Sequence, residues 1–306
     1  MTATMTAAPA PGSDEWARVV TASKVAAILG LSPWESPRTM WLKMRGDLPS
    51  DNGKNADDKA RGHYLEPAIL AWWLDRHPNL QGVEAQAYRT RDQWAAATPD
   101  LDVADDGHGN HAVVEAKSDA TADDWGTPGT DEAPAYYVAQ AMWQLWVTGA
   151  QVCYVPVLFG RPQLGFAEYV IARDDALIAD IVATCRAFYE SLTDDDAAPA
   201  LSDHVAEYDA TRTVHADIDR DLEAVIPDDI ADRYLLDLAH ADRAGASKAR
   251  VLELMGSARV AKTTAGMHLA RRQPKGDAVV LVRTAALPQI TTSTPEPERT
   301  PSWATN

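Results

Sequence analysis

The sequence predicts an α/β protein in which helices flank a mixed central sheet and a helical and β-hairpin appendage follows. Two observations lead to this class. Segments with the apolar spacing of amphipathic helices surround a series of short strand-like runs in residues 14–192. A polar, acidic break at 193–199 then precedes a second helical stretch. With 306 residues, of which 46% are hydrophobic, the chain can build one large domain with an appendage or two modest domains.

Three helices are expected before the strands. The first is short, with its N-terminal cap within 21–23 and its end at Gly30. The second has a proline in its first turn and covers 37–45, and the third covers about 59–75. Residues 1–13 show no apolar period, so a disordered leader is expected there.

The strands are expected where short apolar or alternating runs lie between turn residues. They cover 83–90, 94–98, 101–104, 112–117, 152–159 and 163–171. Pro156 lies inside one of these runs and indicates an edge strand or a bulge, because proline cannot donate to a ladder. Two further helices are expected at 135–148 and 173–192.

The C-terminal third has a different organisation. Residues 193–203 are expected to be a linker, and 204–286 an appendage with a helix at 229–254 and a hairpin turned at 274–276. Residues 287–306 are dense in Thr and Pro, which predicts a disordered tail.

Cysteine usage and hydropathy indicate the class of protein. Cys153 and Cys185 lie in apolar segments without a CxxC or Cys/His spacing, which favours a reducing cytoplasm and argues against a zinc or iron–sulfur site. No run approaches the roughly 18 apolar residues of a membrane span. A soluble protein that is not exported and has no membrane partner is therefore expected.

The net charge of −17 argues against non-specific coating of nucleic acid, whose affinity comes mostly from phosphate neutralisation. The charge leaves open an enzyme whose positive groups line a channel while an acidic outer surface keeps it soluble.

One candidate site stands out in residues 98–117. Asp100 follows one expected strand, a polar turn comes next, and the following strand carries Glu115 and Lys117. Because strand side chains alternate, Glu115 and Lys117 point the same way, and a hairpin would bring Asp100 to the same edge. Two carboxylates beside an ammonium can hold a divalent cation and stabilise developing negative charge, which is the chemistry of a metal-dependent phosphodiesterase. The alternative is a solvated hairpin edge with a salt bridge.

Five motifs occur in an order that resembles the YqaJ-type viral recombinases, relatives of lambda exonuclease within the PD-(D/E)xK nuclease superfamily. The resemblance covers about residues 14–192 and implies a nuclease domain with a PD-(D/E)xK core. The motifs are Thr21-Ala22-Ser23, Gly62-His63-Tyr64-Leu65-Glu66, Thr98-Pro99-Asp100, Glu115-Ala116-Lys117, and Tyr137-Val138-Ala139-Gln140 running into Trp146-Val147-Thr148.

The resemblance implies roles for the residues of the hairpin. Asp100 and Glu115 would be ligands of Mg²⁺ or Mn²⁺, with the carbonyl of Ala116 and the helical Glu66 completing the metal site. Lys117 would orient or help to deprotonate the attacking water and stabilise the transition state. For Glu66, a capped surface glutamate is the alternative interpretation.

Further residues are implied by the same family pattern. Gln140 matches a helical glutamine near the active site, whereas Gln144, one turn on, has weaker support. Ser23 matches the serine that contacts a terminal phosphate, with a helix cap as the alternative. Arg18 is the candidate for the arginine that precedes this serine, although its spacing departs from the family. His63 could assist a metal, or it is a surface helix histidine.

Most tryptophans fall at helical spacing and are expected in the core, including Trp34. Trp125, in the loop at 118–134, is the better candidate for stacking on a DNA end.

The resemblance implies a Mg²⁺-dependent exonuclease acting 5′ to 3′ on double-stranded DNA ends. It implies a single-strand annealing protein as partner and a homotrimer or other ring, in the cytoplasm of a bacterial host if the protein is phage-encoded. The alternatives are an endonuclease or single-strand nuclease on the same core, or a non-catalytic DNA-end-binding adaptor. The sequence leaves the role of the C-terminal third open.

Overall fold

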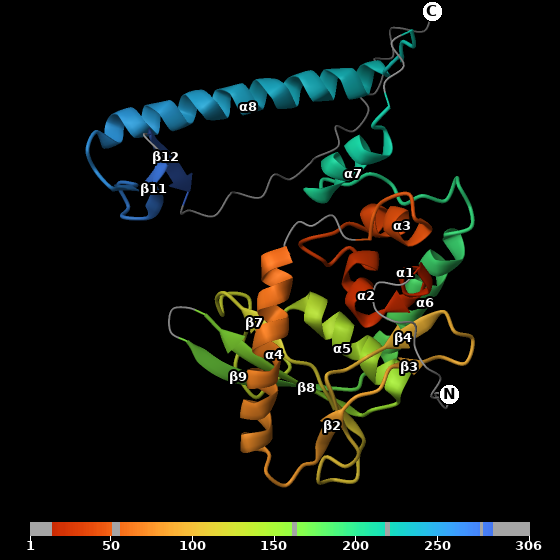
Figure 1. Cartoon of the computed structure of the whole chain (residues 1–306). Helices are drawn as coiled ribbons and strands as arrows, with labels where there is room; N and C mark the ends of the chain where they lie inside the picture. Colours follow the sequence, from red (N-terminus) through yellow and green to blue (C-terminus); the bar gives the residue numbers. More distant parts are fainter. Residues whose placement is uncertain (1–13, 51–55, 161–163, 218–220, 276–277, 284–306) are drawn as a thin grey trace, which may run out of the picture. The chain divides into compact units, whose positions relative to one another are not determined.

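The computed structural model describes residues 14–50, 56–160, 164–217, 221–275 and 278–283 (Figure 1). The chain divides into two compact units, residues 1–218 and 219–306. The described helices of the first unit are α1 (Asp14–Arg18), α2 (Ala22–Ile28), α3 (Pro37–Arg45), α4 (Ala56–Arg76), α5 (Ala135–Thr148), α6 (Asp175–Ser191) and α7 (Ala206–Val214). Its described strands are β1 (Val20–Thr21), β2 (Gly82–Glu84), β3 (Tyr88–Arg89), β4 (Ala95–Ala97), β5 (Leu101–Val103), β6 (Ala112–Val114), β7 (Lys117–Asp119), β8 (Val152–Phe159) and β9 (Gly165–Ala172).

Six of these strands form a mixed sheet around β8. β6 and β7 both run parallel to β8 on one side, and β9 runs antiparallel to it on the other. β5 pairs antiparallel with β6, and β2 with β5. A small second sheet contains β1, β4 and β3. The predicted mixed sheet flanked by helices is therefore confirmed, with the expected strand at 83–90 divided between β2 and β3.

β6 and β7 are two halves of one interrupted strand. Val114 pairs with Tyr154 and Lys117 with Val157, so the register on β8 is unchanged across the interruption. The N–H of Glu115 donates to the carbonyl of Tyr154 at 2.9 Å. A parallel ladder would place the next donor at Pro156, which has no N–H, so the Glu115 carbonyl receives no ladder hydrogen bond from it.

The prediction of an edge strand or a bulge at Pro156 is wrong, because β8 has neighbours on both sides and keeps its register. Proline is tolerated here because the missing ladder bond falls where β6 ends and β7 has not begun. Pro156 does indicate an irregularity in the sheet, but the irregularity is the interruption between β6 and β7 on the neighbouring strand.

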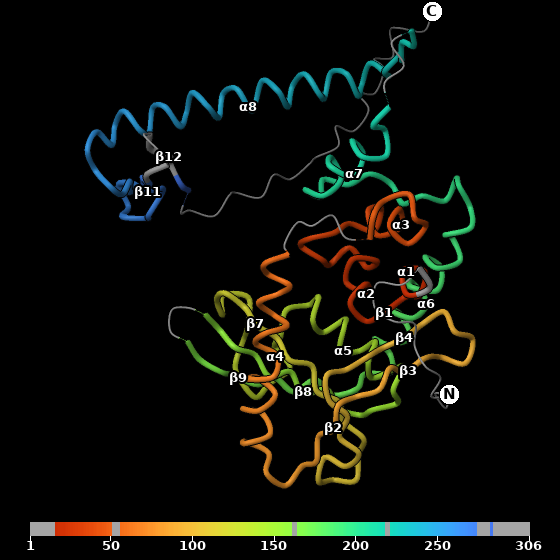
Figure 2. Tube along the Cα trace, viewed as in Figure 1, coloured from red at the N-terminus to blue at the C-terminus, as the bar shows by residue number. Residues whose placement is uncertain are grey.

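The two faces of the sheet are covered by different helices, as Figures 1 and 2 show. One face packs against α4 through Trp73, which contacts side chains of β5 and β6 such as Leu101 and Val114. The alternate side chains, such as Val113 and Val155, belong to the larger core with α2, α5 and α6. Because successive strand residues face opposite sides, Glu115 and Lys117 lie on the α5 side.

Several predicted boundaries match the structure. Helices at 37–45 and 135–148 and the strand at 152–159 are found with those bounds. α3 begins with Ser36 as N-cap and Pro37 in the first turn, and its capping box with Thr39 explains why the start was readable. The short helices α1 and α7 were not predicted.

The first unit extends further than expected. The predicted linker at 193–203 and the start of the appendage at 204 both lie inside it, since the compact unit ends at residue 218. The His204 ring lies 3.1 Å from the carbonyl of Ser32, and Arg38 donates to the carbonyl of Pro199 at 2.8 Å. These long-range hydrogen bonds hold the segment against α3, where composition alone indicated an exposed break.

The second unit contains helix α8 (Asp228–Met255) and strands β10 (Val260–Lys262), β11 (His268–Lys275) and β12 (Ala278–Arg283). β11 and β12 form a hairpin in the predicted region, but Pro274 and Lys275, expected in its turn, are paired with Val279 and Ala278 inside the ladder. β10 adds a third antiparallel strand. The predicted leader at 1–13 and tail at 287–306 lie outside the described residues. Within the described ranges, no helix is both long and apolar enough to span a membrane.

Trp73 provides a test of how α4 is held on the sheet. The side chain is fully buried, and its indole Nε1 has no hydrogen-bond partner. Trp73→Ala is expected to lower the free energy of unfolding by about 3–5 kcal/mol through loss of packing. Trp73→Phe should cost less, because it keeps most of the packing and removes the unpaired N–H. Urea unfolding followed by circular dichroism measures both.

The matched control is Trp72→Ala, because Trp72 is half-buried on the same turn and stacks on Phe166. A loss in Trp73→Ala no larger than that in the control would contradict the proposed dependence of α4 on Trp73.

Candidate active site

The β5–β6 hairpin places Asp100 opposite Glu115. Leu101 pairs with Val114, so the residues just beyond this pair face each other across the ladder. The N–H of Asp100 donates to the carbonyl of Val114 at 3.0 Å. The Asp100 carboxylate in turn accepts from the N–H of Ala116 at 2.7 Å through Oδ2. The expectation that a hairpin brings Asp100 to the edge that carries Glu115 is therefore met in the geometry.

The carboxylate of Glu115 is buried, with 8% of the residue exposed, and accepts three hydrogen bonds. Oε1 accepts from Lys117 Nζ at 2.6 Å and from Gln140 Nε2 at 2.5 Å. Oε2 accepts from Gln144 Nε2 at 2.6 Å. The two glutamines lie one turn apart on α5, so the helix supplies two donors to one carboxylate.

Lys117 joins the strand to α5. Its ammonium lies 5.1 Å from the centre of the Tyr137 ring as well as against Glu115. Burial acts to lower the pKa of Lys117, but the negative charge of Glu115 and its hydrogen bond raise the pKa above its ordinary value, with Asp100 adding to the effect. Lys117 is therefore held as a cation.

Asp100 carries the opposite perturbation. Burial, and then the charge of Glu115, raise the pKa of Asp100 to about 8, while Lys117 and the Ala116 N–H act against this rise. Glu66 on α4 is a further negative charge in the same balance. The half-buried Glu66 is thus electrostatically coupled to the hairpin from the helix that packs on β7 and β8.

If Asp100 and Glu115 were both ionised, they would carry more negative charge than Lys117 neutralises, and a bound divalent cation would stabilise that ionised pair. Among the residues that the structure describes, no three or more His, Cys, Asp or Glu side chains form a group that could hold a metal ion. The donors at the hairpin are instead the two carboxylates and the backbone of Ala116, whose N–H faces Asp100. One or two carboxylates with waters are a typical Mg²⁺ set, so the residues fit such an ion.

A groove of about 880 Å³ begins at β7, next to Lys117, although Asp100, Glu115 and Lys117 are not themselves part of its lining. Ser23 lines it together with Ser118 and Asp119 of β7 and Tyr137 of α5. The cap of α2 is Thr21, which makes no side-chain capping bond, so the interpretation of Ser23 as the helix cap is wrong. Arg18 is exposed at the end of α1 and is not part of the groove lining.

Other residues that the sequence singled out lie elsewhere. His63 is exposed on α4, as expected for a surface helix histidine. Trp125 is 7% exposed and donates from Nε1 to Asp119 at 3.0 Å, so it belongs to the core. Trp34, expected in the core, is 54% exposed. Trp125, predicted to be available for stacking on DNA, is thus buried, and Trp34, predicted to be in the core, is exposed.

Part of the sequence is similar to one known protein family. The family model of the YqaJ-like viral recombinase domain matches residues 15–151. This stretch, which is less than half of the chain, is similar to that family. A search of curated proteins finds no match.

Solved structures are similar to part of the chain. An alkaline exonuclease, LHK-Exo from Laribacter hongkongensis, is 24% identical, with 57% of this chain and 88% of that chain covered and a TM-score of 0.44. A phage-related exonuclease from Haemophilus somnus is 14% identical, with 58% and 96% covered and a TM-score of 0.41.

The structure gives Gln144, the weaker candidate of the sequence, a direct contact in the site and adds Tyr137 to it. Gln144, 1% exposed, is as close a partner of Glu115 as Gln140 is. Its spacing of four residues from Gln140 on one helix could have identified it. Tyr137, which contacts the ammonium of Lys117, carried no signal beyond its place in a motif.

Lys24, next to Ser23, fixes the corner between α1 and α2. Its buried ammonium donates to the carbonyls of Trp16 and Ala17 at 2.8 Å and of Val19 at 2.7 Å, and it lies 4.5 Å from the Trp16 ring centre. Burial lowers the pKa of Lys24 to about 7, and the charge of Glu35 acts against this shift.

The pKa of Lys24 makes stability depend on pH. Between about 7 and 10.5 the unfolded chain binds more protons at this residue than the folded chain, so the contribution of Lys24 to the free energy of unfolding rises with pH. The free energy of unfolding of the wild type minus that of Lys24→Met should therefore become more positive from pH 7 to pH 10. Denaturant titrations at several pH values measure it, with the exposed Lys248→Met as control. A difference independent of pH would contradict the shift.

Proposed function

We propose that the protein is a DNA nuclease that hydrolyses phosphodiester bonds with a divalent metal ion at the β5–β6 hairpin. The observation that carries this proposal is the buried Glu115 carboxylate, held by Lys117, Gln140 and Gln144 and facing Asp100 across the ladder. The match of residues 15–151 to a YqaJ-like viral recombinase domain supports DNA as the substrate.

The residues that would hold the ion are Asp100, Glu115, the carbonyl of Ala116, and Glu66. Bound there, Mg²⁺ or Mn²⁺ would supply Lewis acidity and lower the pKa of a bound water. The glutamines of α5 fix the orientation of the Glu115 carboxylate, because each of its oxygens already accepts a bond from one of them. This arrangement leaves the carboxylate pre-organised before substrate arrives.

Lys117 has a defined role in this proposal. Because the charge of Glu115 and its hydrogen bond raise the pKa of Lys117 despite the opposing effect of burial, the side chain keeps its proton near neutral pH. It therefore acts as a positive hydrogen-bond donor that orients the attacking water and stabilises the negative charge of the phosphorane. Of the two functions that the family resemblance implied for this lysine, orientation fits its protonation state better than proton removal.

We further propose exonuclease activity on double-stranded DNA ends, from 5′ to 3′. The support is Ser23, which places an exposed hydroxyl in the groove beside the hairpin, where a terminal phosphate could bind. Arg18 is retained as a phosphate contact only in this proposal, because it lies outside the groove lining. A ring such as a homotrimer and a single-strand annealing partner belong to the same proposal.

Substitution of the hairpin residues tests the site. Glu115→Gln and Lys117→Met should each lower the rate of degradation of linear duplex DNA in Mg²⁺ by at least about 100-fold, because each removes a charge that acts in the transition state. Chelation of the metal should abolish the activity of the wild type. The control is Glu84→Gln, since Glu84 is an exposed glutamate on β2 of the same sheet. Full activity in both hairpin variants would refute the site.

The polarity is tested on defined ends. Ser23→Ala should reduce the preference for 5′-phosphorylated over 5′-hydroxyl duplex ends about tenfold, because it removes one hydrogen bond to a charged group. Strand-specific labels report which end is shortened, and a closed circle reports endonuclease activity. The exposed Ser247→Ala on α8 serves as control. Cutting of closed circles, or shortening from the 3′ end, would replace the exonuclease proposal with one of its alternatives.

A further inference from the structure

Trp34 is an exposed tryptophan in the lining of the groove. More than half of its surface is accessible, whereas Trp125, on the far side of Tyr137, is buried. A single exposed side chain is ordinary at a protein surface, but this one lies in the lining of a groove. Its neighbours there include apolar residues such as Trp16, Met40 and Val205 as well as polar and charged ones, so the groove combines an accessible ring with groups that can bind a polar ligand.

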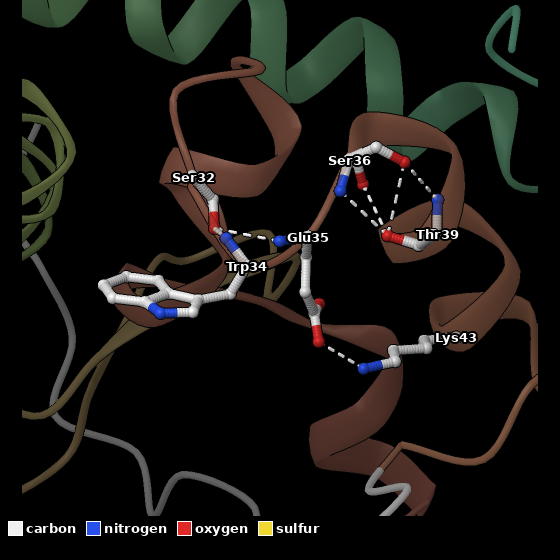
Figure 3. A network of polar contacts seen from close by, with 6 residues as sticks. All are labelled: Ser32, Trp34, Glu35, Ser36, Thr39 and Lys43. Carbon is white, nitrogen blue, oxygen red and sulfur yellow. Dashed lines mark hydrogen bonds and ion pairs between the residues drawn. The ribbon is translucent and has the colours of Figure 1, made fainter. Parts of the chain in front are cut away.

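The backbone on both sides of Trp34 is fixed by hydrogen bonds, as Figure 3 shows. Ser32 Oγ accepts from the N–H groups of Trp34 and Glu35, each at 3.2 Å. The buried Ser36 then begins α3 through its capping box with Thr39. Glu35 forms an ion pair with Lys43 on α3, and the indole of Trp34 lies on the other side of this corner. These hydrogen bonds therefore hold the backbone of Trp34 in a defined position.

A series of ring contacts connects Trp34 to the hairpin. Its indole meets the ring of Tyr136 edge to face, with centres 5.3 Å apart at 77°. Tyr136 packs against Tyr137 at 4.4 Å, and the ammonium of Lys117 lies over Tyr137. The exposed indole is thus two ring contacts from the tyrosine that holds Lys117. Edge-to-face packing supports one side of an indole and leaves the rest available for a further ring.

The groove around Trp34 carries basic side chains that a nucleic acid strand could contact. Lys24, Lys43, Lys59 and Arg61 line it, together with the acidic Glu35, Asp58, Asp119 and Asp209. Lys43 is paired with Glu35 and Arg61 with Asp58, so these cations are held in position by carboxylates. Cations that follow a phosphate backbone, combined with an aromatic ring for the bases, are the usual means of binding single strands.

We propose that Trp34 is the platform on which a base of the DNA strand stacks as the strand enters the site. This inference rests on the proposed nuclease function and assigns the groove lined by residues of α2, α3, α7 and β7 to single-stranded DNA close to the cut. Trp34 then contacts substrate directly and determines how tightly the strand end is held. The phosphate contacts on Ser23 and the base contact on Trp34 lie in the same groove.

Substitution of Trp34 measures the stacking contribution. Because base–aromatic stacking contributes about 1–3 kcal/mol per base, Trp34→Ala should raise the KM for linear duplex DNA about 5- to 150-fold. Trp34→Phe should restore most of the affinity, because a phenyl ring also stacks. Trp72→Ala is the matched control, since Trp72 is a half-buried tryptophan of α4 outside the groove lining. Binding to the same DNA is measured in the uncut state in the Glu115→Gln background.

An abasic scan distinguishes stacking from a structural effect of the substitution. Substrates carry a single abasic residue at each of the first positions from the end. At the position that stacks, the wild type and Trp34→Ala should have the same KM, because the base that Trp34 contacts is missing. A fluorescent adenine analogue at that position should be quenched by the wild-type side chain and less by Trp34→Ala.

The outcomes separate the two proposals. If the wild type degrades DNA and Trp34→Ala has an unchanged KM, or if no abasic position equalises the two proteins, the stacking proposal is overturned and the nuclease proposal stands. A defect in Trp34→Ala that persists at every abasic position, with Trp34→Phe equally impaired, points to a cover of another kind, such as a protein partner. If the wild type neither binds nor degrades linear DNA in Mg²⁺, both proposals fail.

Discussion

The hydrogen bonding of the Glu115 carboxylate is the interaction on which the arrangement of the first unit depends. A buried carboxylate without donors would be prohibitively costly, so strand and helix must meet around it. The strand contributes Lys117 from two residues further along, and α5 contributes Gln140 and Gln144 from consecutive turns. These three bonds fix the rotation of α5 on the sheet. The side chains before Glu115 are packed alternately against α5 and α4. Glu115 and Lys117 therefore both lie on the face of the interrupted strand that α5 covers.

The interruption between β6 and β7 also leaves part of the backbone near Glu115 without ladder hydrogen bonds to β8. Pro156 supplies no N–H where the parallel ladder would place one, so the chain at Glu115 and Ala116 is extended without being fully paired to β8. The N–H of Ala116 faces the other side of the strand, where it donates to the Asp100 side chain. A backbone that is not committed to a ladder can serve a ligand, and here it lies between two carboxylates. A proline in a central strand is therefore explained by the site beside it.

Local chemistry made part of this structure predictable. A proline in the first turn defined α3, and the period of two placed Glu115 and Lys117 on one side. The sequence did not predict which side chains are covered by residues that are distant along the chain. Trp125 lies in a loop yet is covered by Tyr137 and Tyr169, and Trp34 follows a helix yet remains open. Loop membership and helical spacing are poor guides to exposure when the covering side chains come from elements far along the chain. The segment after α6 was misplaced for the same reason, because its hydrogen bonds to α3 are long-range.

The charge balance explains how an acidic chain can be matched to a polyanion. At the hairpin, burial and then the charge of Glu115 raise the pKa of Asp100 to about 8, with Glu66 adding to the effect, so the protein alone holds a proton there that a divalent cation would displace. A cation bound there would reverse the local charge at the place where a phosphate would approach. Lys43 and Arg61 of the groove are paired with carboxylates, which keeps them ordered while limiting long-range attraction. A net charge of −17 and a DNA substrate are compatible under this arrangement, because affinity would be concentrated at the metal, the terminal phosphate and a stacked base. Such an enzyme would bind strand ends at one groove and repel the duplex elsewhere.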